Sequence, residues 1–75
     1  MSATLLSASG DLFLGSDHAT ALAQGPRRFR TVANAIRFAM EQAAPVSLHG
    51  ASLHIGTRRL GPSQIRRLYR AMTGQ

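Results

Sequence analysis

The sequence predicts a small α+β protein in which a mainly antiparallel sheet of two to four strands packs against two amphipathic helices. The chain has 75 residues, which is enough for one domain with a thin hydrophobic core. Apolar residues recur at helical spacing near residues 31–44 and 62–73, and shorter apolar stretches alternate as strands do. We therefore expect one domain over residues 1–75, with residues 1–3 and 74–75 frayed.

The N-terminal third is expected to form a hairpin followed by a short helix. Apolar runs at residues 4–6 and 12–14 lie on either side of Gly10, which accepts a positive φ, so the two runs are expected to pair as strands. Asp17 is a suitable N-cap for a short helix that extends through Ala23.

The first amphipathic helix is predicted to begin after an N-cap at Thr31 and to end before Pro45. Phe38 is the exception to its pattern, because this aromatic lies on the polar side of the helix. It needs a cover, which is either another part of the chain or a partner, so Phe38 is our candidate interface residue. The apolar side consists of Val32, Ala33, Ile36, Ala39, Met40 and Ala43.

Two further strands are expected at residues 46–48 and 51–55, where small polar and apolar residues alternate. His49-Gly50 is then either a tight turn between the two strands or, with Gly50 as a bulge, part of one longer strand.

The final helix carries the clearest local signal in the chain. Gly61 is a tolerable N-cap, and Pro62 at the first helical position has its φ already fixed. Apolar residues follow at helical spacing, namely Ile65, Leu68, Tyr69 and Met72, and the opposite side carries Arg66, Arg67 and Arg70.

The charge is strongly positive and unevenly distributed. The net charge is +6, and all nine basic residues are arginines that fall within residues 26–75, whereas residues 1–25 contain two aspartates and no base. Such asymmetry indicates a polyanionic partner, such as nucleic acid, an anionic membrane or an acidic protein. The alternative is that GC-rich coding DNA, which favours Arg and Ala, produced the excess.

The candidate polyanion-binding residues lie at and after the start of the final helix. Arginine binds phosphate through two parallel N–H groups, and the unpaired N–H groups at a helix N-terminus attract anions. The alternative is a solvated outer face, with Arg70 complementing the helix dipole. The set consists of Arg58, Arg59, Ser63, Arg66, Arg67 and Arg70.

A second basic cluster, Arg27, Arg28 and Arg30, surrounds Phe29. This pattern is typical of single-strand binding segments, in which a ring stacks on a base. Phe29 also precedes the helix that starts at Thr31, and there it serves equally well as a packing residue against that helix.

No pattern predicts catalysis, a metal or a cofactor, and no small-molecule substrate is inferred. His49 and His54 are five residues apart, so they point to opposite faces of one regular strand unless a bulge intervenes, and His18 is far from both in the sequence. There is no cysteine, and no phosphate-binding or metalloprotease motif. Since no catalytic motif is present, we expect a non-enzymatic protein. No apolar run approaches 18 residues and no secretory signal is recognisable, so we expect it to be cytoplasmic.

The chain resembles a loose group of small uncharacterised bacterial proteins over about its last 50 residues. The resemblance implies a compact strand–helix–strand–helix unit of unknown function and transfers no functional residue. It depends on residues of the two helices and the segment between them: Phe29, Thr31, Val32, Ala35, Ile36, Arg37, Phe38, Met40, Glu41, Leu60, Ile65, Leu68 and Tyr69.

Taken alone, the sequence favours a non-catalytic module that binds nucleic acid or another polyanion through arginines. The alternative is a homodimeric or protein-interaction module that uses Phe38 and an uncovered sheet face. Binding to an anionic membrane surface through the final helix is a third, weaker hypothesis.

Overall fold

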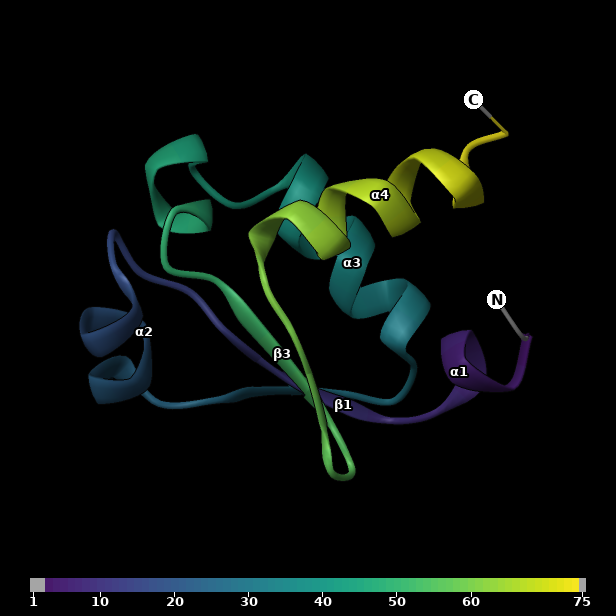
Figure 1. Ribbon diagram of the computed structural model, residues 1–75, viewed down its shortest axis with the longest axis horizontal. Helices are drawn as coiled ribbons and strands as arrows, with labels where there is room; N and C mark the ends of the chain where they lie inside the picture. Colours follow the sequence, from purple (N-terminus) through teal and green to yellow (C-terminus); the bar gives the residue numbers. More distant parts are fainter. Residues whose placement is uncertain (1–2, 75) are drawn as a thin grey trace.

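The computed structural model describes residues 3–74, which form four strands, four α-helices and one 3-10 helix (Figure 1). The elements in chain order are α1 (Ala3–Ser7), β1 (Gly10–Phe13), α2 (His18–Gln24), β2 (Arg27–Phe29), α3 (Val32–Glu41), η1 (Pro45–Leu48), β3 (Ser52–Ile55), β4 (Arg58–Leu60) and α4 (Pro62–Met72). The predicted α+β class is confirmed, with the sheet at the upper end of the expected strand number.

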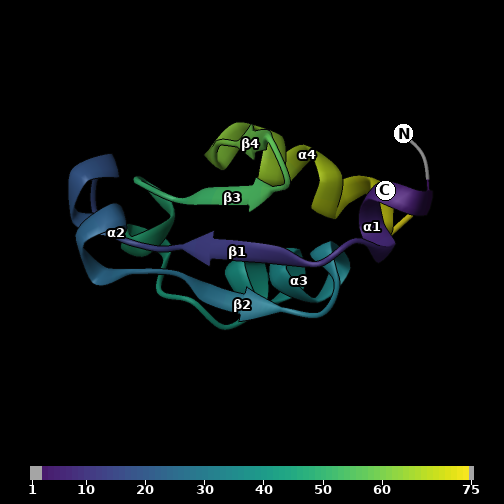
Figure 2. The same ribbon diagram turned by 90° about the horizontal axis from the view of Figure 1, so that it is seen from below.

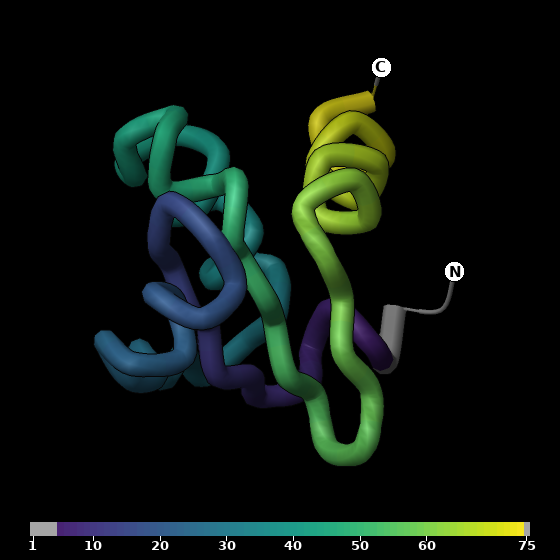
Figure 3. Tube along the Cα trace, turned by 60° about the vertical axis from the view of Figure 1, so that its left-hand side comes forward, coloured from purple at the N-terminus to yellow at the C-terminus, as the bar shows by residue number. Residues whose placement is uncertain are grey.

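The sheet has the strand order β2-β1-β3-β4, and each neighbouring pair is antiparallel. Helices α3 and α4 contact each other and lie on one side of it (Figure 1). Figure 2 views the sheet from the other side, with β1 and β2 in front of α3, and α1 and α2 at opposite ends. The β3–β4 hairpin extends away from the helices, as the trace in Figure 3 shows. One face of the sheet therefore has no helix across its middle.

The hydrophobic core lies between the helices and the other face of the sheet. The register places Leu12, Leu53 and Leu60 side by side on three neighbouring strands, and all three are buried. Ile36 from α3 and Ile65 from α4 are fully buried in the same cluster. Burying each such side chain contributes about 1.5–3 kcal/mol, so this row holds the two layers together.

Both predicted amphipathic helices are confirmed, with their predicted caps. Thr31 Oγ1 accepts a hydrogen bond from the Asn34 N–H at 3.1 Å at the start of α3. Gly61 begins α4, where its N–H donates to Gln64 Oε1 at 2.9 Å. α3 ends at Glu41, three residues before the predicted end. The predicted short helix is also present, since α2 begins after Asp17 and extends one residue beyond Ala23.

The predicted N-terminal hairpin is wrong. Residues 4–6 belong to the helix α1, and β1 pairs instead with β2 and β3. The strand expected at residues 12–14 overlaps β1. Its partners are distant in sequence, and a local turn signal at Gly10 does not reveal them. β2 was not predicted, because its sequence was interpreted only as a basic cluster.

The predicted strand at residues 46–48 is also wrong, because Pro45 starts the 3-10 helix η1 there. The tight turn lies at Gly56-Thr57, between β3 and β4, and not at His49-Gly50. Gly56 has a φ of 59°, the left-handed conformation that a two-residue hairpin turn needs and glycine adopts without strain. The strand expected at residues 51–55 is confirmed as β3.

The expected frayed ends fall partly on residues 1, 2 and 75, which lie outside the described residues. Within residues 3–74, no helix combines the length and the apolar character needed to cross a membrane.

Candidate functional site

The sheet face that lacks helices carries a row of polar side chains across all four strands. The register pairs Arg28 of β2 with Asp11 of β1, Asp11 with His54 of β3, and His54 with Arg59 of β4. Because side chains directly opposite in antiparallel strands share a face, these four residues lie on the same side of the sheet. We call this row and its neighbours Ser9, Phe13 and Ser52 the open face.

Two aromatic rings lie in the middle of the open face. Phe13 and His54 have ring centroids 4.5 Å apart and planes tilted by 42°. Ser52 is buried and lies opposite Phe13 in the register. Its Oγ forms a hydrogen bond of 2.9 Å with His54 Nε2. Both side chains are half-buried, so each has one part in contact with solvent and another part packed against its neighbours.

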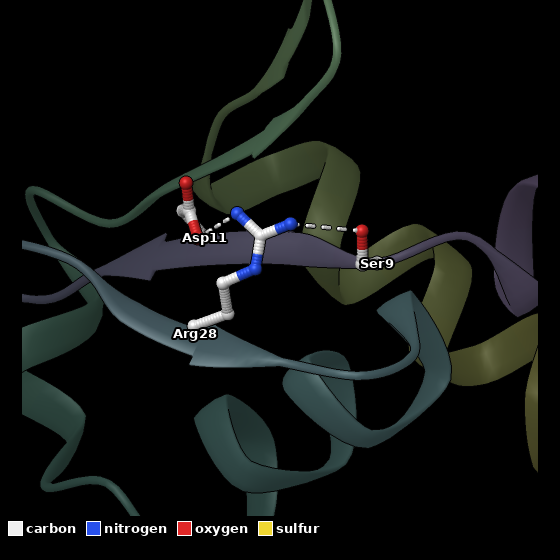
Figure 4. A network of polar contacts seen from close by, with 3 residues as sticks. All are labelled: Ser9, Asp11 and Arg28. Atoms are coloured by element: carbon white, nitrogen blue, oxygen red, sulfur yellow. Dashed lines mark hydrogen bonds and ion pairs between the residues drawn. The ribbon is translucent and has the colours of Figure 1, made fainter.

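Arg28 extends across β1 rather than away from the sheet, as Figure 4 shows. Its guanidinium contacts Asp11 Oδ1 at 3.3 Å and donates to Ser9 Oγ at 3.2 Å. The Arg28 side chain is still 71% exposed and that of Asp11 is 32% exposed. Exposed ion pairs of this kind contribute about 0–1 kcal/mol, so the contact between Arg28 and Asp11 is weak.

A pocket of about 260 Å³, which we call the histidine pocket, lies where β1 ends and β3 begins. It shares Ser52 and Arg59 with the open face. Its lining comes from α2, the η1–β3 connection, β4 and the start of α4, and consists of His18, His49, Gly50, Ala51, Ser52, Arg59, Leu60, Gly61 and Pro62.

A close backbone contact brings the two histidines of this pocket together. The Gly50 N–H donates to the Gly15 carbonyl at 2.9 Å, and a side chain at Gly50 would collide with the backbone of Asp17. Only glycine permits this approach, which places the start of α2, with His18, on the same pocket as His49. Among residues 3–74, no group of three metal-ligating side chains exists, so these two rings lack a third ligand.

The sequence-predicted polyanion residues are distributed over both layers. Arg59 lies on the open face, whereas the register places Arg58 opposite Ile55, on the face that carries the helices. The remaining four are exposed on α4: Ser63, Arg66, Arg67 and Arg70. The structure therefore places Arg59 on the same face of the sheet as Arg28, from the other basic cluster, and a binding role for the α4 residues stays a prediction.

Phe38 is half-buried and covered from within the chain. Its ring centroid lies 5.5 Å from that of Phe29, and the Arg27 guanidinium carbon lies 4.4 Å from the Phe38 centroid. Phe29 thus has the packing role that was one of its two sequence interpretations. A partner interface at Phe38 stays a prediction, since the intrachain cover leaves part of the ring exposed.

Each of the three acidic side chains has a partner. Asp11 contacts Arg28, and Asp17 accepts the Thr20 N–H at 2.8 Å, a bond that lowers the pKa of Asp17 below its ordinary 3.8. Glu41 accepts the Tyr69 hydroxyl at 2.9 Å, which raises the pKa of Tyr69 above its ordinary 10.0. Among the described residues 3–74, the ion pair found is that of Arg28 with Asp11. The positive charge of the other arginines in this range is therefore not balanced by an ion pair.

Sequence reasoning missed Phe13 and His54 as site residues and did not connect His18 with His49. These pairs depend on strand register and on the packing at Gly50, neither of which has a local signal. The alternation of Asp11 and Phe13 with buried Gly10 and Leu12 was the available clue to the face. No known protein family, curated protein or solved structure matches this chain, so the resemblance to small bacterial proteins stays a prediction.

Proposed function

We propose that this protein is a non-catalytic module that binds single-stranded nucleic acid on the open face. The observation that carries the proposal is the cross-strand row, with arginines at its two ends and aromatic rings beside its centre. Arg28 and Arg59 are three strand spacings apart, or about 14 Å. A nucleic-acid strand that crosses the sheet thus meets the Arg28 guanidinium over β1 and Arg59 on β4, with the Phe13 and His54 rings beside the row.

The chemistry of the open face favours an unpaired strand. Bases that are not stacked in a duplex present their flat faces to aromatic side chains, and each such stack contributes about 1–3 kcal/mol. Arg28 and Arg59 are exposed and suited to binding phosphate oxygens through two N–H groups. Asp11, once displaced from Arg28, accepts hydrogen bonds from amino groups on base edges.

The charge of the whole molecule supports the same ligand class. The net charge is +6, and the three acidic side chains already have partners in the protein. The resulting positive field accelerates association with a polyanion and makes its affinity dependent on salt.

The character of the open face does not favour self-association as its main role. Stable homodimer interfaces are enriched in apolar residues at their centre and depleted in charge. Here the centre of the face holds Asp11 and His54, with Arg28 and Arg59 at the edges. Two copies placed face to face would bring like charges together unless they were offset.

The test measures the binding of labelled single-stranded DNA and RNA of about 12 nucleotides to the wild type and to charge-matched double variants. R28Q/R59Q removes two charges from the open face, and R66Q/R67Q removes two from α4. We expect wild-type affinity to fall steeply between about 50 and 200 mM salt, and R28Q/R59Q to lose at least about tenfold more affinity than R66Q/R67Q.

Three outcomes would contradict this assignment. Equal losses in the two double variants would indicate a non-specific charge effect, and a larger loss in R66Q/R67Q would place the site on α4. Absence of micromolar binding at low salt would exclude the function.

The variant F13L, which keeps apolar bulk but removes the ring, is expected to weaken binding without changing its salt dependence, because it removes stacking and no charge.

A further inference from the structure

The histidine pocket continues the open face at one end. Ser52 and Arg59 belong to both, and His18 and His49 lie beyond them. Figure 2 shows α2, which begins with His18, at this end of the sheet. A strand that runs across the open face toward the pocket therefore meets α2 and has to end or turn there.

The pocket offers cationic and N–H-donating side chains without an opposing carboxylate. His18, His49 and Arg59 come from three different parts of the chain, and no acidic residue is among the described residues that line it. The carboxylate next along the chain, Asp17, accepts the Thr20 N–H and interacts electrostatically with His18, but it does not line the pocket. The three residues thus line one volume that suits an anion.

The remaining lining limits how an anion is bound. The N–H groups of Gly50, Ala51 and Gly61 already donate to oxygens of the protein. The side-chain donors on the lining are the imidazole and guanidinium N–H groups, while Leu60 and Pro62 supply apolar wall. The positive end of the α4 dipole, at Gly61, adds to the same field.

We infer that the histidine pocket binds the terminal phosphate of a single-stranded nucleic acid that lies on the open face. This inference depends on the proposed function. A terminal phosphate carries about −1.5 to −2 charges near neutral pH, whereas each internal phosphate carries one, so a pocket lined by an arginine and two imidazole donors prefers the end of the strand. Its volume of about 260 Å³ holds one small group and not a folded nucleic acid.

The test compares three oligonucleotides of one sequence, with a 5′-phosphate, a 3′-phosphate or hydroxyls at both ends. We expect one phosphorylated form to bind the wild type about tenfold more tightly than the hydroxyl form. H18Q/H49Q is expected to abolish that preference and to keep the affinity for the hydroxyl form. H54Q, the matched control on the open face, is expected to weaken all three oligonucleotides by the same factor.

A second measurement does not depend on a folded variant. The chain has three histidines, so their ring-proton NMR signals are few enough to follow in the wild type. The preferred phosphorylated oligonucleotide should shift the signals of His18 and His49, and the hydroxyl form should leave them in place. Their assignment follows from H18Q and H49Q as single variants.

The results separate the two proposals. Equal binding of the three oligonucleotides, a preference that survives in H18Q/H49Q, or unmoved His18 and His49 signals would overturn the pocket assignment and leave the open face in place. Failure of all three oligonucleotides to bind would overturn both.

Discussion

Single side chains decide which charges of this protein are available to a ligand. With nine arginines and three acidic residues, the partners of the carboxylates matter more than the total charge. Asp17 serves the start of α2 and Glu41 serves Tyr69, so neither neutralises an arginine. Asp11 is the exception, and its exposed pair with Arg28 is weak, as the proposed exchange for a phosphate requires.

The Tyr69–Glu41 hydrogen bond joins α4 to α3 and gives a measurable titration. The bond holds the proton on Tyr69, so the pKa of this phenol is raised above 10.0 in the folded protein. A raised pKa means that the stabilisation is fully present below about pH 10 and is lost as the pH rises through the folded-state pKa. We expect the pKa of Tyr69 to lie closer to 10 in the E41A variant than in the wild type.

Phenolate absorbance measures this titration directly, because the chain has one tyrosine and no tryptophan. Q42A is the control: it changes the neighbouring exposed side chain and should leave the titration of Tyr69 where it is in the wild type. The same midpoint in wild type and E41A would show that the bond to Glu41 does not hold the phenolic proton.

Secondary-structure elements differ in how far their own sequence determines them. α3 and α4 were predicted because their signals are local: a cap at Thr31 or Gly61 and apolar residues at helical spacing. Strands β2 and β4 have three residues each and end next to helices that dominate the pattern around them. Their existence depends on pairing with β1 and β3, which is a property of the fold.

The same distinction explains which parts of the candidate site were predictable. Arg59 was predicted from charge alone, and it does lie on the open face. The row from Arg28 to Arg59 required the order β2-β1-β3-β4, in which Asp11 pairs with Arg28, 17 positions away, and with His54, 43 positions away. The approach of His18 to His49 required the glycine contact at Gly50, which in the sequence was only a turn or a bulge.

At the element scale, the cap of α3 gives a quantitative prediction. Thr31→Ala removes the oxygen that accepts the Asn34 N–H, and N-cap losses of this kind cost about 1 kcal/mol. In a domain of this size, the melting temperature should fall by about 4–8 °C, which thermal unfolding followed by circular dichroism measures. Thr31→Ser keeps the oxygen and should remain near the wild type. A similar loss in both variants would mean that the methyl group, and not the cap, is responsible.

In the molecule as a whole, one face of the sheet packs against the helices to form a small core, and the other face carries the candidate site. Chains of this size have a free energy of unfolding of about 4–11 kcal/mol, so the helical face has little stability to spare. β3 illustrates the constraint: Leu53 points into the core, while Ser52 and His54 on either side of it belong to the open face. The side chains of the open face are therefore held in place by the packing beneath them.

Leu53→Ala tests this dependence. Leu53 is fully buried between Leu12 and Leu60, and deleting such a side chain costs about 2–5 kcal/mol, a large share of the total. We expect the urea midpoint to fall sharply, and nucleic-acid binding to be lost in proportion to the unfolded fraction. Leu22→Ala, at a leucine that is 41% exposed on α2, should change stability by no more than about 0.5 kcal/mol.

R28Q/R59Q should show the opposite pattern, with weakened binding and an unchanged urea midpoint, because both arginines are exposed and lie on the side of the sheet away from the core. If Leu53→Ala and Leu22→Ala lost equal stability, the strands would not be held by the leucine row. If R28Q/R59Q lowered the midpoint as Leu53→Ala does, the arginines would support the fold, and their loss would no longer report on a ligand.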